Sequence, residues 1–421
     1  MKPYGEFYKG ENTSRAEQSG FTATSNLDIH SEIGYASPQL ALTSESTTPN
    51  EACISAIVPT GDVYFFSKTT GKTWKRAVAD ATYTLVNTNA NTAHRGARYF
   101  NGKLYYWTAT KLGHYDLATT WTDSFATLAN GNGRGSAILN LSLFIADGND
   151  ISSVDNTGTF AQSSLDLETN FIITDICAVG NDLLIGTINS TSNGICKAFL
   201  WDTYSSSWSY EDEVFEAGIN CFIQTDNLTL AQCGNSGWIY YWTGSRLEKF
   251  KKIKGITTTN TATYHALTTT LNGKALLANG TYIYSIHRES KDLPMAICRE
   301  YTSTGTISSI LAAGNQLLVS YGDGIDKIGT SYATATLDTP EANEESQMVE
   351  VYYDSLPSGT SIGISTKING GDWTAQTPII DTINRRVYFD GGLLDVVFMQ
   401  ARATLTPATT NKPVIRNIVI K

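Results

Sequence analysis

The stretch Asn101-Gly-Lys-Leu-Tyr-Tyr-Trp107 places an Asn-Gly turn directly in front of an apolar run, and this pattern returns along much of the chain. Seven turns of this kind begin at Gly61, Asn101, Asn140, Asn181, Asn227, Asn272 and Asn315. Successive turns are separated by 40, 39, 41, 46, 45 and 43 residues. A unit that recurs at a fixed interval of roughly 20–50 residues indicates a repeat architecture.

Each turn is also preceded by an apolar run, so the two runs together predict a β-hairpin. The preceding runs cover residues 54–58, 97–100, 136–139, 176–179, 219–223, 265–268 and 310–313. A third run and a weaker fourth run usually follow, the last fourth run being residues 335–337. Four strands in about 40–45 residues match one propeller blade. Because a lone blade leaves both faces apolar, the blades are expected to close into a ring.

The sequence therefore predicts an all-β fold with a β-propeller of about seven blades over residues 34–338. Six or eight blades remain alternatives to this number. The segment Gly34-Tyr-Ala-Ser-Pro-Gln-Leu-Ala-Leu-Thr43 could supply a strand that joins the last blade and closes the ring.

Composition changes on either side of the repeats. Residues 339–347 are acidic and poor in strand-forming residues, which indicates a linker. Residues 348–421 alternate apolar and polar side chains around an Asn369-Gly-Gly turn and predict a small β-sandwich. Residues 1–33 are polar without a sustained period, so we expect an N-terminal arm that is either disordered or ordered by a neighbouring subunit.

The chain is acidic, with 30 Lys and Arg against 40 Asp and Glu in 421 residues and a formal net charge of −10. Because nucleic-acid affinity comes mostly from clustered Lys and Arg, we expect no nucleic-acid partner. The basic run at residues 246–254 alternates with Phe250 and Ile253 and is interpreted as an edge strand protected by lysines. No apolar run approaches the roughly 18–20 residues that span a bilayer, so we expect no membrane insertion and synthesis in a cytoplasm.

Spacings typical of catalytic or metal-binding sites are missing from the sequence. The five histidines are far apart, and the six cysteines form no C-x-x-C pair and are expected to be reduced core thiols. Asp147-Gly-Asn-Asp150 followed by Asp155 could hold Ca²⁺, but we interpret these residues as a polar blade turn. Repeat intervals of 39–46 residues leave little chain for loops that build a pocket. We therefore expect no catalytic residue, no cofactor and no metal.

The segment Ser67-Lys-Thr-Thr-Gly-Lys-Thr-Trp74 resembles the Asp-box turn of sialidases, with Thr69 at the Asp position. In that family the box is a structural turn, so the resemblance implies a propeller fold and says nothing of catalysis.

Aromatic side chains are the remaining binding candidates. We name four tryptophans that could stack on a sugar or on a protein neighbour: Trp201, Trp208, Trp238 and Trp242. The alternative interpretation is that these side chains fill the space between blades.

The domains follow one another as a polar arm, a propeller with short loops and a small sandwich. The arm leads into Asp28-Ile-His-Ser-Glu-Ile-Gly-Tyr-Ala-Ser-Pro-Gln-Leu40, and the chain closes on Ile415-Arg-Asn-Ile-Val-Ile420. This order resembles tailed-bacteriophage virion proteins, in which the propeller is a rigid platform and the sandwich and termini contact ring neighbours. The resemblance implies a non-enzymatic structural component of the virion, in a tail or neck ring, hub or adaptor, that contacts other virion proteins and copies of itself. The alternative is a tail module that binds a receptor or glycan on the host surface.

Overall fold

A computed structural model describes residues 2–3, 21–31, 34–191, 194–225, 228–253, 256, 263–288, 295–343, 348–391 and 396–421. The chain divides into two compact units. One unit consists of Ser44–Gly280 and Thr304–Lys327, and the other of Met1–Thr43, Thr281–Ser303 and Ile328–Lys421.

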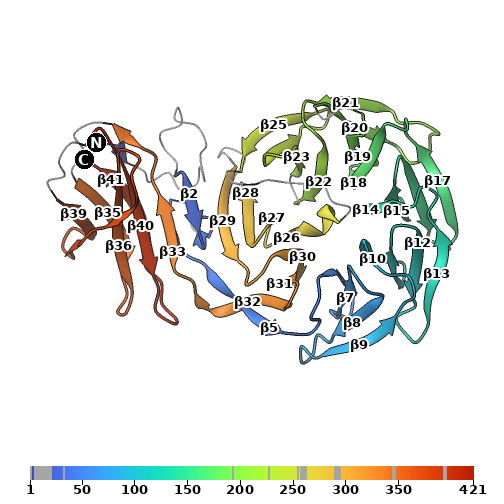
Figure 1. Ribbon diagram of the computed structural model, residues 1–421, viewed down its shortest axis with the longest axis horizontal. Coiled ribbons are helices and arrows are strands. Elements are labelled where there is room, and N and C mark those ends of the chain that lie inside the picture. Colours follow the sequence, from blue (N-terminus) through green and yellow to red (C-terminus); the bar gives the residue numbers. More distant parts are fainter. Residues whose placement is uncertain are drawn as a thin grey trace. The chain divides into compact units, whose positions relative to one another are not determined.

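Within the described residues, seven four-stranded sheets form the blades of a β-propeller. Figure 1 shows the sheets around a common centre, with β10, β14, β18, β22, β26 and β30 nearest to it. The first blade consists of β6 (Cys53–Ile57), β7 (Val63–Ser67), β8 (Lys72–Arg76) and β9 (Tyr83–Thr88). The second consists of β10 (Gly96–Phe100), β11 (Lys103–Trp107), β12 (Lys111–Tyr115) and β13 (Trp121–Thr127). The third consists of β14 (Gly133–Leu139), β15 (Ser142–Asp147), β16 (Asp150–Asp155) and β17 (Phe160–Asp166). The next two consist of β18 (Phe171–Val179), β19 (Asp182–Asn189), β20 (Cys196–Trp201) and β21 (Tyr210–Val214); and β22 (Ile219–Gln224), β23 (Thr229–Cys233), β24 (Trp238–Trp242) and β25 (Leu247–Lys252). The last two consist of β26 (Thr268–Leu271), β27 (Lys274–Asn279), β28 (Tyr282–His287) and β29 (Ala296–Thr302); and β30 (Ile307–Ala313), β31 (Gln316–Tyr321), β32 (Gly324–Tyr332) and β5 (Leu40–Ser46).

The turns that set the repeat join the first and second strands of the blades, as the sequence predicts. Asn101 and Gly102 connect β10 to β11 and both have positive φ, 44° and 81°. Such a turn follows the twist of a hairpin, and Asn and Gly adopt it at the lowest cost. Asn227, which begins the fifth of these turns, lies outside the described residues.

The last blade is completed by a strand from the other end of the chain. In its sheet the hydrogen-bonded order is β30, β31, β32 and β5, so the closing strand after residue 34 and the number of seven blades are confirmed. The structure corrects the fourth strand expected at residues 335–337. β33 (Ala335–Asp338) pairs instead with β40 of the sandwich, because Ala335 and Leu337 are buried in the core of that domain.

The structure also corrects the strand expected at residues 265–268. Residues Tyr264–Leu267 form the 3₁₀ turn η2, the short yellow coil beside β26 in Figure 1, and the strand begins at Thr268. The Thr268 hydroxyl donates a hydrogen bond of 3.0 Å to the carbonyl of His265. This bond stabilises the turn in place of a longer strand.

The second domain is the predicted β-sandwich. One sheet has the order β1 (Lys2–Pro3), β41 (Val414–Ile420), β35 (Met348–Ser355), β39 (Arg386–Asp390) and β38 (Ile379–Asp381). The other has the order β2 (Ala23–Ser25), β33, β40 (Phe398–Thr406), β36 (Ser361–Ile368) and β37 (Thr374–Ala375), with β34 (Ala342–Asn343) also paired to β40, while β3 (Leu27–Asp28) pairs with β4 (Ser37–Pro38). Alternate side chains of β36 and β40 are buried, as expected for strands with one core-facing side.

The structure differs from the expected N-terminal arm wherever it describes residues 1–33. β2 pairs with β33, and β1 pairs with β41. Phe21, Leu27 and Ile29 are buried in the core of the same unit. These scattered apolar side chains explain how a segment without a sustained period is held by its own chain. Residues 4–20 and 32–33 of the expected arm, and 344–347 of the expected linker, lie outside the described residues.

Candidate functional site

A cavity of about 590 Å³ lies between the first strands of the blades. All seven of these strands contribute to its described lining. Because they belong to separate sheets, side chains rather than a backbone ladder connect them. For example, the Thr269 hydroxyl accepts a 3.2 Å hydrogen bond from the Ala312 N–H, and the Ser308 hydroxyl donates one of 3.1 Å to the Cys53 carbonyl.

Asp175 and Arg98 bring opposite charges into this lining. The Asp175 carboxylate accepts hydrogen bonds from the N–H of Ile176 at 2.9 Å and of Phe222 at 2.8 Å. Burial raises the pKa of Asp175 to about 7, although these two hydrogen bonds and the charge of Arg98 act in the opposite direction. The guanidinium of Arg98 donates to the Ser136 carbonyl at 3.1 Å, which joins β10 to β14.

His265 also faces the cavity, from the turn η2. The turn packs against β22, β26, β27 and β30. Burial, and then the charges of Lys68, Arg134 and Arg98, lower the pKa of His265 to about 3, so the ring is neutral near pH 7. Among the described residues neither ring nitrogen makes a hydrogen bond of ordinary geometry, although the Arg95 backbone lies close enough to act on the pKa of His265 in the raising direction.

Four cations lie within electrostatic reach of His265 or of one another, and of these Arg98 lines the cavity. Lys68 directly follows β7, whose end pairs with the start of β6 through Ser67 and Cys53. Arg95 and Arg134 both donate to the side-chain oxygen of Asn132, at 2.9 and 3.3 Å. Lys68, Arg95, Arg98 and Arg134 are hereafter called the axial cations.

The pKa values of all four axial cations are lowered. Burial lowers the pKa of Lys68, Arg95 and Arg98, and burial together with Arg95 lowers that of Arg134 to about 10. A lowered pKa means that the charged form is less well stabilised than in water. No spacing in the sequence identifies this group, although Arg98 interrupts the apolar run 97–100 and His265 begins the run 265–268.

The structure does not bring the four predicted tryptophans together on one surface. Trp201 is buried, its indole N–H donates to the Ser205 carbonyl at 2.7 Å, and its ring packs edge-on against Phe144 of the preceding blade. Trp208 packs edge-on against Phe199, with ring centroids 5.1 Å apart. For Trp201 the structure corrects the stacking hypothesis, because its ring fills space between two blades.

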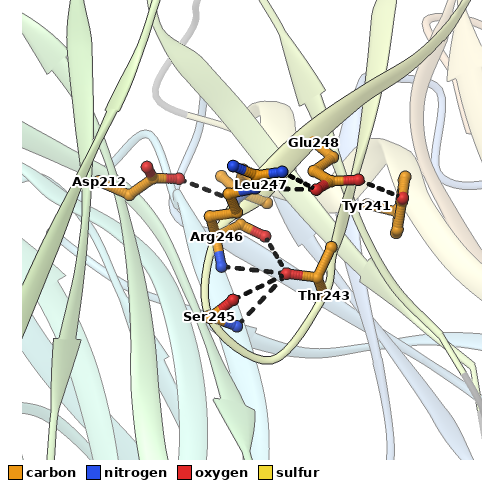
Figure 2. A network of polar contacts seen from close by, with 7 residues as sticks. All are labelled: Asp212, Tyr241, Thr243, Ser245, Arg246, Leu247 and Glu248. Carbon is orange, nitrogen blue, oxygen red and sulfur yellow. Dashed lines mark hydrogen bonds and ion pairs between the residues drawn. The ribbon is translucent and has the colours of Figure 1, made fainter.

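Trp238 and Trp242 lie on β24 and are partly buried against one hydrophobic cluster. The ammonium of Lys249 lies 3.9 Å from the ring centroid of Trp238 and so covers that face. Beyond Trp242, Figure 2 shows the turn to β25 held by polar contacts. Asp212 of the preceding blade accepts a 2.7 Å hydrogen bond from the Leu247 N–H.

Other apolar side chains are more exposed than these tryptophans. Tyr204, which lies between Trp201 and Trp208 in the sequence, is 82% exposed, and Phe215 is 71% exposed. In the sandwich, Ile380 on β38 is 56% exposed and Ile383 in the following turn is 92% exposed. The exposure of these residues could not be predicted, because an apolar side chain at the edge of a sheet does not alter the apolar and polar alternation of the sequence.

The two polar motifs of the sequence form turns. In the segment that resembles an Asp-box, Glu51 accepts hydrogen bonds of 3.0 Å from the hydroxyls of both Thr69 and Thr70, so this carboxylate holds the turn together. Asp147 accepts from the N–H groups of Asn130 and Asn132, each at 2.9 Å, as a blade turn requires.

Three further observations concern binding and location. In the part of the chain that the structure describes, no three His, Cys, Asp or Glu side chains gather in a way that could hold a metal ion. All six cysteines are buried thiols, as predicted. None of the described helical segments has the length and apolar character needed to cross a bilayer.

No protein-family model and no curated protein sequence matches the chain. Solved structures match it in fold. The extracellular domain of a hybrid two-component system from B. thetaiotaomicron has a TM-score of 0.51 at 12% identity over 83% of this chain and 51% of that chain, so the chain spans about half the length of that domain. Virginiamycin B lyase from Staphylococcus aureus has a TM-score of 0.51 at 14% identity over 69% of this chain and 98% of that chain. A streptogramin B lyase has a TM-score of 0.50 at 12% identity over 71% of this chain and 97% of that chain. At these identities the likeness shows the fold alone, and the protein is a β-propeller protein.

Proposed function

We propose that the chain is a non-enzymatic structural component of a bacteriophage particle, in a tail or neck ring, hub or adaptor. There it contacts copies of itself and other virion proteins. The order of a propeller with short loops and a terminal sandwich supports this proposal. The observation that carries it furthest is an exposed apolar edge on the sandwich.

This edge consists of Ile379 and Ile380 on β38 and Ile383 in the turn that follows. β38 is the last strand in the order of its sheet, so one side of its backbone has no neighbouring strand among the described residues. Ile379 and Ile380 are adjacent in sequence and both exposed, so both faces of the strand are apolar. An apolar edge strand left open in water is a template for pairing with another chain.

The charge of the sandwich favours a second copy of this chain as the occupant of the edge. Residues 348–421 contain seven Lys and Arg against six Asp and Glu, while the whole chain carries −10. Two nearly neutral sandwich domains can therefore approach each other without the repulsion that the acidic propeller would produce. In a ring such contacts repeat between neighbours.

Sedimentation velocity of the full chain over a concentration series tests the self-association. The wild type is expected to associate, and Ile380→Lys is expected to weaken the association tenfold or more, because it places a charge on the apolar edge. Leu85→Lys, at an exposed position on the outer strand β9, is the matched control and should associate like the wild type. Equal association of Ile380→Lys and wild type would contradict the proposed interface.

A tail module that binds a host glycan remains the second candidate, now supported by different residues. Tyr204 lies in the connection before β21 and Tyr210 is the first residue of β21, and both rings are exposed. Exposed tyrosines can stack on sugar rings. Glycan-array binding that is lost in Tyr204→Ala would favour this candidate, and the absence of glycan binding would remove it.

A further inference from the structure

We propose that the cavity between the first strands of the blades is a binding site for a small oxyanion, a molecule or ion that carries a carboxylate or phosphate group. Arg98 is its direct donor, and Lys68, Arg95 and Arg134 supply the surrounding positive potential. This inference is independent of the proposed role in a phage particle.

Arg98 lines the cavity with hydrogen-bond donors that no described residue uses. Its guanidinium carries five N–H donors, and the hydrogen bond to the Ser136 carbonyl uses one of them. Among the described residues no carboxylate forms an ion pair with Arg98, Lys68 or Arg95. More than a third of the Arg98 surface is open to the cavity although seven strands surround it. A guanidinium with free forked donors in such a place matches a planar carboxylate or a phosphate.

Positive charge is in local excess around Arg98. Four cations lie within electrostatic reach of the neutral His265 or of one another. The nearest carboxylates are already used, since Asp147 and Asp175 each accept two backbone hydrogen bonds. In a chain with a net charge of −10, cations gathered in a protein-walled cavity create a focused positive potential. A bound anion would restore the stabilisation of the charged forms that burial removes.

The cavity also has a suitable size and neutral donors for a small anion. A volume of about 590 Å³ falls within the range of roughly 300–1,000 Å³ typical of small-molecule sites. His265, whose ring nitrogens make no hydrogen bond of ordinary geometry to a described residue, can donate one N–H to the same anion. The lining also includes the hydroxyls of Ser55, Ser136 and Thr269.

Isothermal titration calorimetry on the full chain tests the proposal, with sodium phosphate in one arm and sodium citrate in the other, at an ionic strength held constant with chloride. Saturable binding of one anion per chain is expected in at least one arm. Binding of phosphate alone indicates a phosphate ligand, and binding of citrate alone indicates a carboxylate ligand. The absence of saturable binding in both arms would overturn the proposal.

Variants locate the binding in the cavity. Arg98→Gln should weaken binding about tenfold or more, the effect expected for loss of a charged hydrogen-bond donor. Arg246→Gln removes an exposed arginine on the outer edge of the fifth blade and should leave the affinity unchanged. If Arg98→Gln does not fold, Lys68→Gln takes its place, because among the described residues only the backbone N–H of Lys68, and not its ammonium, forms a hydrogen bond. Lys68→Gln should weaken binding several-fold. Unchanged affinity in whichever of these two variants folds would place the anion elsewhere and overturn the proposal.

Discussion

The carboxylate of Asp175 accepts a 2.8 Å hydrogen bond from the backbone N–H of Phe222, and this bond joins the inner strands of two neighbouring blades. The two strands, β18 and β22, belong to separate sheets. Both strands also have a register shift close to these residues, which frees the backbone groups for such a contact. The centre of the ring therefore depends on individual polar side chains as well as on apolar packing.

The first prediction concerns the pH dependence of stability. Burial raises the folded-state pKa of Asp175 to about 7, above its ordinary value of 3.8. A carboxyl whose pKa is raised on folding stabilises the protein fully at low pH, and this contribution is lost as pH rises from about 4 to 7. The wild type should therefore lose stability relative to Asp175→Asn over that window, by on the order of a few kcal/mol. Urea unfolding of both proteins between pH 4 and pH 8 measures the difference, and a difference that does not vary with pH would contradict the assignment.

The second prediction concerns Gly135, which lies against Asp175. A Cβ at this position would lie 2.0 Å from Asp175 Oδ1 and 2.9 Å from its Cα, so the carboxylate and its strand must shift. Gly135→Ala should destabilise the propeller by about 1–3 kcal/mol. Gly363→Ala in β36 is the control, because its Cβ would find no atom closer than 3.6 Å. Equal melting temperatures for the two variants would show that the inner strands tolerate the displacement.

The third prediction concerns the turn between β7 and β8. Glu51 accepts hydrogen bonds from the hydroxyls of Ser67, Thr69 and Thr70. Glu51→Ala leaves these donors without their acceptor and should cost about 1–3 kcal/mol. Glu168→Ala, at an exposed position, should stay within about 0.5 kcal/mol of wild type. Chemical denaturation measures the free energy of unfolding of the two variants. A Glu51→Ala variant as stable as the wild type would mean that water replaces the carboxylate.

The fourth prediction concerns the segment before the first propeller strand. Phe21 is 2% exposed and packs in the sandwich core, so Phe21→Ala should destabilise that domain by about 3–5 kcal/mol. Hydrogen exchange should rise in β33 and β40 and stay unchanged in β14 and β18. Tyr204→Ala, which removes an exposed ring, is the control. Unchanged exchange in the Phe21 variant would mean that this segment does not support the sandwich.

Much of the fold could be predicted because the repeat is local. A turn such as Asn101-Gly102 specifies its own hairpin, and seven turns at similar intervals specify the blades. Long-range pairing was harder to predict. The run at residues 335–337 has a strand pattern in either domain, and only its partner, β40, decides which sheet it joins. Phe21 and Leu27 have no periodic context, so their burial depends on distant strands such as β33 and β29, the latter 271 residues away at the contact of Cys298 with Leu27.

The candidate site could be predicted less well than the fold. Lys68, Arg98 and His265 come from three different blades, and only closure of the ring brings them together. Single charged residues in separate runs carry no spacing that identifies a site. The role of a tryptophan was hard to predict for a related reason, since an aromatic ring on a blade strand can either face solvent or fill the gap to the next blade, as Trp201 does.

Electron cryo-microscopy of purified phage particles from cells that express this chain tests the central claim most directly. The account predicts a seven-bladed propeller with its sandwich domain at a fixed, symmetric position in the tail or neck of every particle, with the β38 edge covered by a neighbouring copy. Purified particles that lack the chain, or that carry it with the β38 edge open to solvent, would contradict the account.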